Sequence, residues 1–322
     1  MKYRRTYISF MKRSLSFFLT VASLIGLVGC GSDPDSDDGK VRIVATTTMI
    51  ADMAKAIVGD VQDVEVITLM GPGVDPHTFN LPSRSLSDLR RADVVLYNGL
   101  HLEGRTSEVY EPLSEGGAVV LAVGDAIAKA DLLGAEIAAH PDPHIWGDPK
   151  LWAGCIDSVV SAISGKLPDK ATNLKANGQA YRQQLLDLDE WAKGRFAELP
   201  EGNRVVITSH DAFNYFGRAY GLEVLAPQGI STEGEVGMAD IAETAKLIKE
   251  RGVRAIFTES SVNPATIQRL ASDTGAKTGG ELFSDALGAA GEIEKSGGES
   301  YDVGTYIGMI KHNVNTIVEA LK

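Results

Sequence analysis

A stretch without any strand signal, residues 169–199, divides this chain into two parts that otherwise follow the same plan. Its apolar residues recur at steps of three, four, five or seven, with charged residues between them. This spacing predicts one long amphipathic helix over residues 174–199, closed by Pro200 and Gly202. At about 1.5 Å per residue the helix would be ~38 Å long, enough to run beside two lobes. The alternative is a pair of shorter helices within one domain.

Short β-branched segments alternate with helical patterns on both sides of this helix. Such alternation indicates βαβ units and a mainly parallel sheet. We therefore predict an α/β fold of two lobes, each with a mainly parallel sheet flanked by helices, joined by one long interlobe helix. Its parts are an N-terminal lobe (residues 41–168), a connecting helix (169–200) and a C-terminal lobe (201–322). The expected strands are residues 41–46, 64–69, 93–98, 118–123, 204–209, 222–226, 254–259 and 277–282, and the other expected helices are residues 50–57, 85–91, 238–249, 264–272 and 306–321.

The N-terminus has the pattern of an export signal. The first thirteen residues hold five basic and no acidic side chains, and an apolar run follows over residues 15–28. The run is too short and too N-terminal for an ordinary spanning helix. It ends in Leu-Val-Gly-Cys, which resembles the bacterial lipobox, so we predict a signal peptide over residues 1–29 and a lipidated Cys30. A plain signal peptide with an incidental cysteine is the alternative. Residues 30–40, with the lipidated Cys at their start, read as an acidic tether without a fold.

The charge of the mature chain narrows the range of partners. Removal of five basic residues with the signal changes the formal net charge from −12 to −17. This charge argues against nucleic acid and against electrostatic binding to an anionic membrane, and it is compatible with attraction of cations. With Cys30 assigned to the lipid, Cys155 has no partner for an internal disulfide and is expected to be a small buried residue.

Two of the six histidines lie in a repeated tripeptide, Asp75-Pro76-His77 and Asp142-Pro143-His144. Proline fixes its own φ and keeps the preceding residue extended, so each motif presents an imidazole from a stiff loop. Taken singly, either motif could be a proline-bearing turn with a surface histidine.

Two further donors follow strands of the second lobe. His210 comes directly after the strand at 204–209, and Asp285 lies just beyond the strand at 277–282. Loops after parallel strands gather at one edge of a sheet, so these two residues could meet His77 and His144 there. Three neutral imidazoles and one carboxylate would make a good divalent-metal site. Singly, His210 could instead start a helix, and Asp285 could be an N-cap or turn residue.

Other residues near this edge are weaker predictions. Glu259 ends a strand and Ser209 precedes His210, so either could orient a ligand or be an ordinary strand-end residue. Trp146 is expected to pack its loop against the first lobe and to shield the site. The other three histidines are not expected to be ligands. His101 follows a strand in a solvated loop, nothing rigidifies His140, and His312 lies in the final helix, far from any strand end.

The motifs resemble the metal-binding lipoproteins of bacterial ABC importers, the cluster A-I solute-binding proteins of the TroA type. The resemblance runs in unbroken order from about residue 41 to residue 322. It implies a buried metal in the cleft, with His77 and His144 from the first lobe and His210 and Asp285 from the second. The segments that carry it are residues 73–77 (GVDPH), 92–99 (ADVVLYNG), 142–149 (DPHIWGDP), 209–216 (SHDAFNYF) and 280–285 (GELFSD).

Two departures matter within that family. The zinc-specialised ZnuA branch often carries a His- and acid-rich loop ahead of the second histidine, but residues 125–140 hold only His140 here. The manganese branch usually has Glu where this chain has His210. The sequence thus resembles the His-His-His-Asp subtype, which the family associates with both zinc and manganese.

The resemblance implies a receptor and not an enzyme. Zn²⁺ or Mn²⁺ would be captured as the transported ligand and passed to a membrane permease, powered by a separate ATPase subunit. We expect a monomer, exported and lipid-anchored, periplasmic or on the outer face of the cell membrane, that captures metal through local loop changes near His210 and Asp285. A metal-dependent surface adhesin is an alternative. Another is an exported zinc hydrolase in which Glu281 or Asp211 would act as base.

Overall fold

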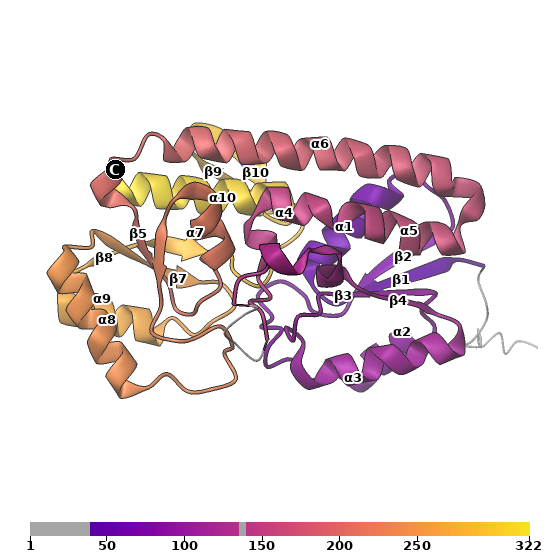
Figure 1. Cartoon of the computed structure of the whole chain (residues 1–322), viewed down its shortest axis with the longest axis horizontal. Helices are drawn as coiled ribbons and strands as arrows, with labels where there is room; N and C mark the ends of the chain where they lie inside the picture. Colours follow the sequence, from indigo (N-terminus) through magenta and orange to yellow (C-terminus); the bar gives the residue numbers. More distant parts are fainter. Residues whose placement is uncertain (1–38, 135–139) are drawn as a thin grey trace, which may run out of the picture. The chain divides into compact units, whose positions relative to one another are not determined.

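The computed structural model describes residues 39–134 and 140–322 of the chain (Figure 1). The predicted signal peptide, Cys30 and most of the acidic tether lie outside these residues. Lys40–Lys322 form one compact unit. Within the described ranges, none of the helices combines the length and the apolar character that a membrane span requires.

The first lobe is built on a parallel sheet with the strand order β2-β1-β3-β4. Successive residues of a strand face opposite sides of the sheet. Ile43 and Ala45 of β1 therefore join the core that contains α1 and α5. Val44 faces the other way, into a smaller core with Leu89 of α2 and Tyr110 of α3. The elements are β1 (Val41–Ala45), α1 (Thr48–Val58), β2 (Val64–Thr68), α2 (Ser83–Arg90), β3 (Val94–Tyr97), α3 (Ser107–Tyr110), β4 (Val119–Ala122), α4 (Pro149–Gly154) and α5 (Ile156–Lys166).

The second lobe repeats the α/β plan with a less continuous sheet. Two parallel pairs, β5 with β6 and β7 with β8, are hydrogen-bonded separately. Phe257 and Leu282 face the core that contains α10, whereas Ile256 faces α8 and α9. The predicted α/β fold is confirmed for both lobes. The elements are β5 (Val205–Ile207), α7 (Asn214–Tyr220), β6 (Glu223–Leu225), α8 (Met238–Arg251), β7 (Ala255–Glu259), α9 (Ala265–Thr274), β8 (Lys277–Leu282), β9 (Ile293–Ser296), β10 (Glu299–Asp302) and α10 (Tyr306–Leu321).

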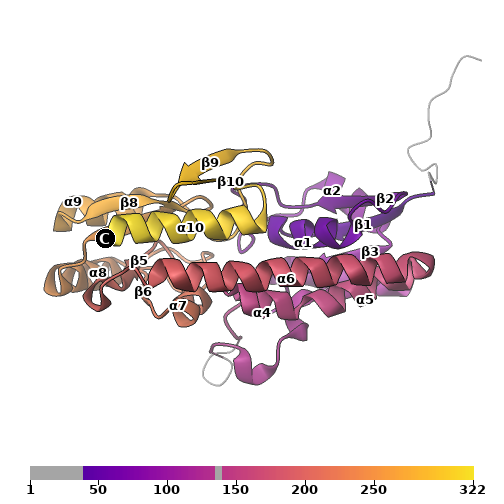
Figure 2. The same ribbon diagram turned by 90° about the horizontal axis from the view of Figure 1, so that it is seen from above.

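One long helix, α6 (Ala171–Phe196), contacts both lobes, so the predicted single interlobe helix is correct. It begins three residues earlier than the predicted start at residue 174. It packs on α1, α4 and α5 of the first lobe and on α7 and α10 of the second (Figure 2). Most of the apolar positions that predicted it are buried, among them Leu174, Tyr181 and Leu185.

The sequence prediction missed the β9–β10 hairpin and the helices α3, α4, α5 and α7. The β9–β10 hairpin is antiparallel and turns at Gly297 and Gly298, both with positive φ, as a two-residue hairpin turn requires. Its strands lack an alternating apolar pattern, so only the Gly-Gly pair could have indicated them. Helices α4 and α5 lie between His144 and α6. Asp148 caps α4 by accepting hydrogen bonds from Lys150 N and Leu151 N, an Asp-Pro start signal that we did not use.

Two glycines of α6 test how closely this helix packs. A Cβ at Gly178 would lie 2.7 Å from the Cγ2 atom of Val160 in α5, whereas a Cβ at Gly194 would meet nothing within 4 Å. Gly178→Ala should therefore lower the free energy of unfolding by about 1–2 kcal/mol through overpacking. Gly194→Ala should raise it by roughly 0.5–1 kcal/mol through helix propensity. Urea unfolding of both variants checks this, and equal effects would contradict the close approach.

Candidate metal centre

The structure brings the four predicted donors together. One possible ligand atom from each of His77, His144, His210 and Asp285 lies within 4.8 Å of all the others. His77 follows β2, His144 precedes a short 3₁₀ turn, and His210 and Asp285 follow β5 and β8. Their exposed fractions are only 6%, 0%, 0% and 1%, so the cluster is buried.

The distances within the cluster fit a single small cation. His77 Nε2 lies 3.3 Å from His144 Nε2, and His144 Nε2 lies 3.5 Å from Asp285 Oδ1. His210 Nε2 lies 3.4 Å from Asp285 Oδ2. Donors held ~2.0–2.1 Å from a tetrahedral zinc ion would be ~3.3–3.4 Å from one another. These three distances thus already match the separations that such an ion requires.

Carboxylates outside the cluster orient two of the imidazoles. Asp142 Oδ1 lies 2.8 Å from His144 Nδ1 and also accepts a hydrogen bond from His144 N. Glu259 Oε2 lies 2.6 Å from His210 Nδ1, while its Oε1 accepts hydrogen bonds from Ser209 N and His210 N. Both contacts leave Nε2 facing the cluster. Glu259 therefore contacts the histidine that the sequence suggested it could orient, whereas Ser209 contributes its backbone amide and not its hydroxyl.

Several buried polar atoms of the cluster have no hydrogen-bond partner among the described residues. They include Asp285 Oδ1 and His210 Nε2. The other carboxylate oxygen, Asp285 Oδ2, accepts a hydrogen bond from Ser261 Oγ at 3.0 Å. Unpartnered buried polar atoms are costly and uncommon. A cation between the donors would satisfy these atoms, so the residues present fit a metal ion.

Burial and charge move the pKa values of the cluster in different directions. Burial, with a smaller contribution from the neighbouring imidazoles, lowers the pKa of His77 to about 4 against the pull of Asp285. Burial also disfavours the charged form of His210, but Asp285 and Glu259 outweigh it and hold the pKa of His210 well above its usual value. Burial opposes ionisation of Asp285 too, yet the imidazoles keep its pKa below the usual range. A metal that binds at neutral pH must therefore displace a proton from His210.

Side chains of α7 hold the first-lobe histidine loop from the opposite lobe. Tyr215 Oη donates a hydrogen bond to the Asp142 carbonyl at 2.8 Å, and Asn214 Nδ2 donates to Asp142 Oδ2 at 3.1 Å. Sequence reasoning missed both residues, although they follow His210 within one motif.

Trp146 also differs from the prediction. Its indole Nε1 donates to the Ser284 carbonyl of the second lobe at 2.7 Å, so it joins the lobes as well as packing in the core.

The remaining histidines lie outside the cluster. His101 and His140 stack on each other with centroids 4.0 Å apart and an interplanar angle of 8°. A ligated metal lies in the plane of each imidazole, and two parallel stacked rings share no such plane. His312 Nε2 lies 3.0 Å from the Glu281 carbonyl oxygen on β8.

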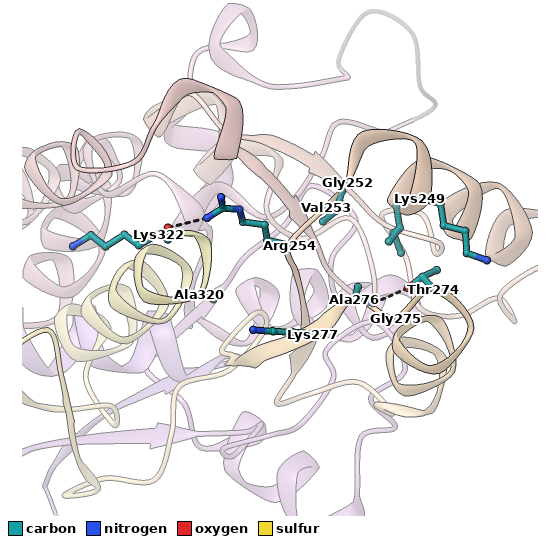
Figure 3. A pocket seen from close by; sticks show the side chains of 11 residues that line it. Lys249, Gly252, Val253, Arg254, Thr274, Gly275, Ala276, Lys277, Ala320 and Lys322 are labelled. Carbon is teal, nitrogen blue, oxygen red and sulfur yellow. Dashed lines mark hydrogen bonds between the residues drawn. The ribbon is translucent and has the colours of Figure 1, made fainter.

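A surface hollow lies at the end of the second-lobe strands opposite to the metal cluster, where β7 and β8 begin and α8, α9 and α10 end (Figure 3). Arg254 Nη1 donates a hydrogen bond to the Lys322 carbonyl at 2.8 Å, and the Lys322 ammonium pairs with Glu198. None of the side chains that line it, all of them described, has a buried polar atom without a partner. This open basic surface is separate from the metal cluster.

Comparison with known proteins agrees with the fold and identifies the family. The profile of the family described as "Zinc-uptake complex component A periplasmic" (ZnuA) matches residues 43–320. The chain is 40% identical over 303 residues to the manganese-binding lipoprotein MntA of Bacillus subtilis (strain 168), covering 92% of this chain and 95% of the relative. It is 42% identical over 296 residues to the zinc-binding protein TroA of Treponema pallidum (strain Nichols), covering 90% of this chain and 92% of the relative.

A solved structure shows the same architecture. The periplasmic zinc binding protein TroA from Treponema pallidum superposes with a TM-score of 0.82 at 42% identity, covering 88% of this chain and 99% of that one. Two α/β lobes, one long helix and a buried His₃Asp cluster define a metal-binding protein of the TroA type. The chain belongs to the ZnuA family of periplasmic metal-uptake components, as its motifs predicted.

The raised pKa of His210 predicts how metal binding depends on pH. Below that pKa, the affinity for Zn²⁺ should rise about tenfold per pH unit for each proton displaced. Glu259→Gln removes one of the two carboxylates that raise the pKa of His210, so the dependence between about pH 6 and 8 should flatten. At about pH 8, the same variant should bind Zn²⁺ roughly 10–100-fold more weakly than the wild type, since His210 is no longer oriented.

Competition titrations with a chelating dye across this pH range measure both effects. Glu281→Gln is the matched control, because Glu281 lies on the neighbouring strand β8 with an exposed side chain. A wild-type affinity that does not change with pH, or a Glu259→Gln variant indistinguishable from Glu281→Gln, would contradict the prediction.

Proposed function

We propose that this protein is an extracytoplasmic solute-binding lipoprotein of an ABC importer. It captures one Zn²⁺ or Mn²⁺ ion between its lobes with His77, His144, His210 and Asp285, and delivers the ion to a membrane permease that a separate ATPase subunit powers. The observation that carries this proposal is the convergence of four buried donors, two from each lobe, at separations suited to one ion. Relatives named manganese-binding lipoprotein and zinc-binding protein support it.

The donor set favours binding over catalysis. A catalytic zinc keeps one position open for water and needs a nearby base. Four protein donors fill a tetrahedral shell, and all four are buried. Of the two candidates for that base, Glu281 is exposed, and neither it nor Asp211 belongs to the cluster. The protein thus acts as a carrier whose metal is cargo.

The cluster suits manganese and zinc, the metals in the printed names of the two relatives compared above. Three imidazoles favour zinc, which also binds more tightly than manganese at most shared sites. Both oxygens of Asp285 face an imidazole, at 3.5 Å from His144 Nε2 and 3.4 Å from His210 Nε2. A carboxylate that uses both oxygens adds a fifth donor, which suits the higher coordination number of manganese. Zinc should therefore bind more tightly, while either ion can be carried.

The proposal includes a membrane anchor at the N-terminus. Residues 1–29 are removed as a signal peptide, Cys30 carries the lipid, and residues 30–40 tether a monomeric body of two lobes, residues 41–168 and 201–322, joined by residues 169–200. The lipobox-like sequence before Cys30 supports this arrangement. So do the printed names of relatives such as the metal ABC transporter substrate-binding lipoprotein FimA of Streptococcus parasanguinis, which is 29% identical over 309 residues.

Metal content of the purified protein tests the binding site. The wild type should carry close to one equivalent of zinc after exposure to Zn²⁺ and removal of the excess. His210→Ala should lose most of it, because a buried carboxylate and two imidazoles remain without their fourth partner. His101→Ala, a histidine outside the cluster, should retain the wild-type content. Elemental analysis gives the stoichiometry, and unchanged zinc in both His210→Ala and His77→Ala would refute the assignment.

Lipid labelling tests the anchor. Cells that express the wild type should incorporate labelled palmitate into the protein, since lipidation at Cys30 adds acyl chains. Cys30→Ser should lose the label and appear in the soluble fraction, whereas Cys155→Ser should keep it because Cys155 is fully buried in the first-lobe core. Equal labelling of Cys30→Ser and wild type would exclude this anchor site.

A further inference from the structure

One loop of the second lobe reaches the first-lobe side of the cluster. This loop, residues 228–237, lies between β6 and α8, and we call it the strap. Its base is joined to the metal centre. Gln228 forms a parallel bridge with His210, and Asp211 N donates a hydrogen bond to the Gly229 carbonyl at 3.4 Å. The start of the strap is therefore fixed beside a second-lobe donor.

The tip of the strap contacts the loop that carries a first-lobe donor. Thr232 Oγ1 donates a hydrogen bond to Asp75 Oδ2 at 2.5 Å. The other oxygen, Asp75 Oδ1, accepts a hydrogen bond from His77 N at 2.9 Å. A single carboxylate thus joins the strap to the backbone of His77. Thr232 links the two halves of the metal centre across the lobes without itself being a donor to the ion.

The strap also lies close to the backbone around His77. A Cβ built on Gly104 would be 3.4 Å from Glu233 Oε1 and 3.8 Å from the His77 carbonyl oxygen. Of the four donors, His77 has the largest exposed fraction, 6%, against at most 1% for the others. The least enclosed side of the cluster is therefore the side that the strap covers.

The strap is held less firmly than the buried interlobe contacts. Elsewhere, buried groups join the lobes, as in the Trp146 contact with Ser284 and the Tyr215 contact with Asp142. In the strap, residues 231 and 233–235 are exposed, and Thr232 is only half-buried. Segments with few buried contacts and exposed hydrogen bonds open at low free-energy cost. An opening of the described structure near His77 should thus begin at the strap.

We propose that Thr232 is a positioning residue that holds the strap over His77 and so sets the rate at which bound metal is released. The proposal rests on the metal site under "Proposed function". When the hydrogen bond from Thr232 to Asp75 breaks, the strap lifts, and solvent and competing ligands reach His77 first. The link from Asp75 to the His77 backbone makes the position of that histidine depend on the closed strap.

The chain contains a matched control for this hydrogen bond. Thr78 Oγ1 donates to the same atom, Asp75 Oδ2, at 3.1 Å, but from the same loop and the same lobe. Thr232→Val and Thr78→Val each remove one hydroxyl donor from one carboxylate at nearly constant side-chain volume. Only Thr232→Val removes a link between the lobes. Thr232→Ser restores the hydroxyl and serves as the rescue variant.

Release of zinc to an excess of a chromogenic chelator, followed by stopped flow, tests the proposal. Loss of a hydrogen bond to a charged acceptor should make Thr232→Val release zinc roughly tenfold faster, with one equivalent still bound at the start. Thr232→Ser and Thr78→Val should release it within about twofold of wild type. An unchanged rate in Thr232→Val, or an equal acceleration in Thr78→Val, would overturn the proposal.

A measurement without metal separates this inference from the proposed function. Hydrogen exchange of the metal-free protein should show faster exchange in residues 228–237 of Thr232→Val than of Thr78→Val, with unchanged exchange in α6. Unchanged exchange in the strap overturns the positioning role whatever metal the protein binds. A wild type that binds no metal while Thr232→Val still loosens the strap would overturn the proposed function but leave Thr232 as the residue that holds the strap.

Discussion

The carboxylate of Asp142 lies between the two lobes and accepts hydrogen bonds from both of them. Within its own loop it contacts the backbone amide and Nδ1 of His144, and from α7 it accepts a hydrogen bond from Asn214. Tyr215 holds the carbonyl of the same residue. One buried side chain thus aims an imidazole at the cluster and anchors its loop to the opposite lobe. The geometry of the metal centre depends on this contact, because a ligand loop free to move would scatter the donors.

The helix side and the strap side of the molecule differ in how they join the lobes. On the helix side, α6 contacts elements of both lobes, and the Asp52 carboxylate of α1 accepts hydrogen bonds from Tyr181 of α6 and from Tyr306 N of α10. On the other side, the exposed strap makes one half-buried hydrogen bond through Thr232. Packed helices resist large rotations of one lobe against the other. Metal exchange is therefore expected to use movement of loops.

Burial and nearby carboxylates have opposite effects on the protonation of the metal cluster. The cluster gathers three imidazoles around one carboxylate in a buried space, and burial alone would keep His77 and His210 neutral. Asp285 and Glu259 counter this at His210, which favours a proton there until a metal replaces it. Under the proposed function, a metal ion that binds there displaces this proton. A protein of this kind can hold a divalent ion tightly and still respond to the acidity of its surroundings.

Much of the architecture followed from local sequence patterns. The apolar, β-branched segments of β1, β3 and β7 and the spacing in α6 report burial directly, because a strand or helix in contact with a core must carry apolar side chains at its own period. Three of the four donors could be nominated for a related reason, since loops after parallel strands share one edge of a sheet. His144 could be nominated because it repeats the Asp-Pro-His tripeptide of His77. The β9–β10 hairpin was not predicted because its polar strands have no alternating apolar pattern.

The residues that form hydrogen bonds to the metal-donor loops could not be predicted from local sequence patterns. Asn214 and Tyr215 reach Asp142 from more than 70 positions away along the chain, and Thr232 reaches Asp75 from 157 positions away. No local period records which polar side chain meets another across two lobes. By itself the sequence determined the fold class, the long helix and the four residues able to bind a metal. Only the tertiary structure decided which buried groups aim those residues and which loop covers them, because those contacts arise from how the two lobes pack together.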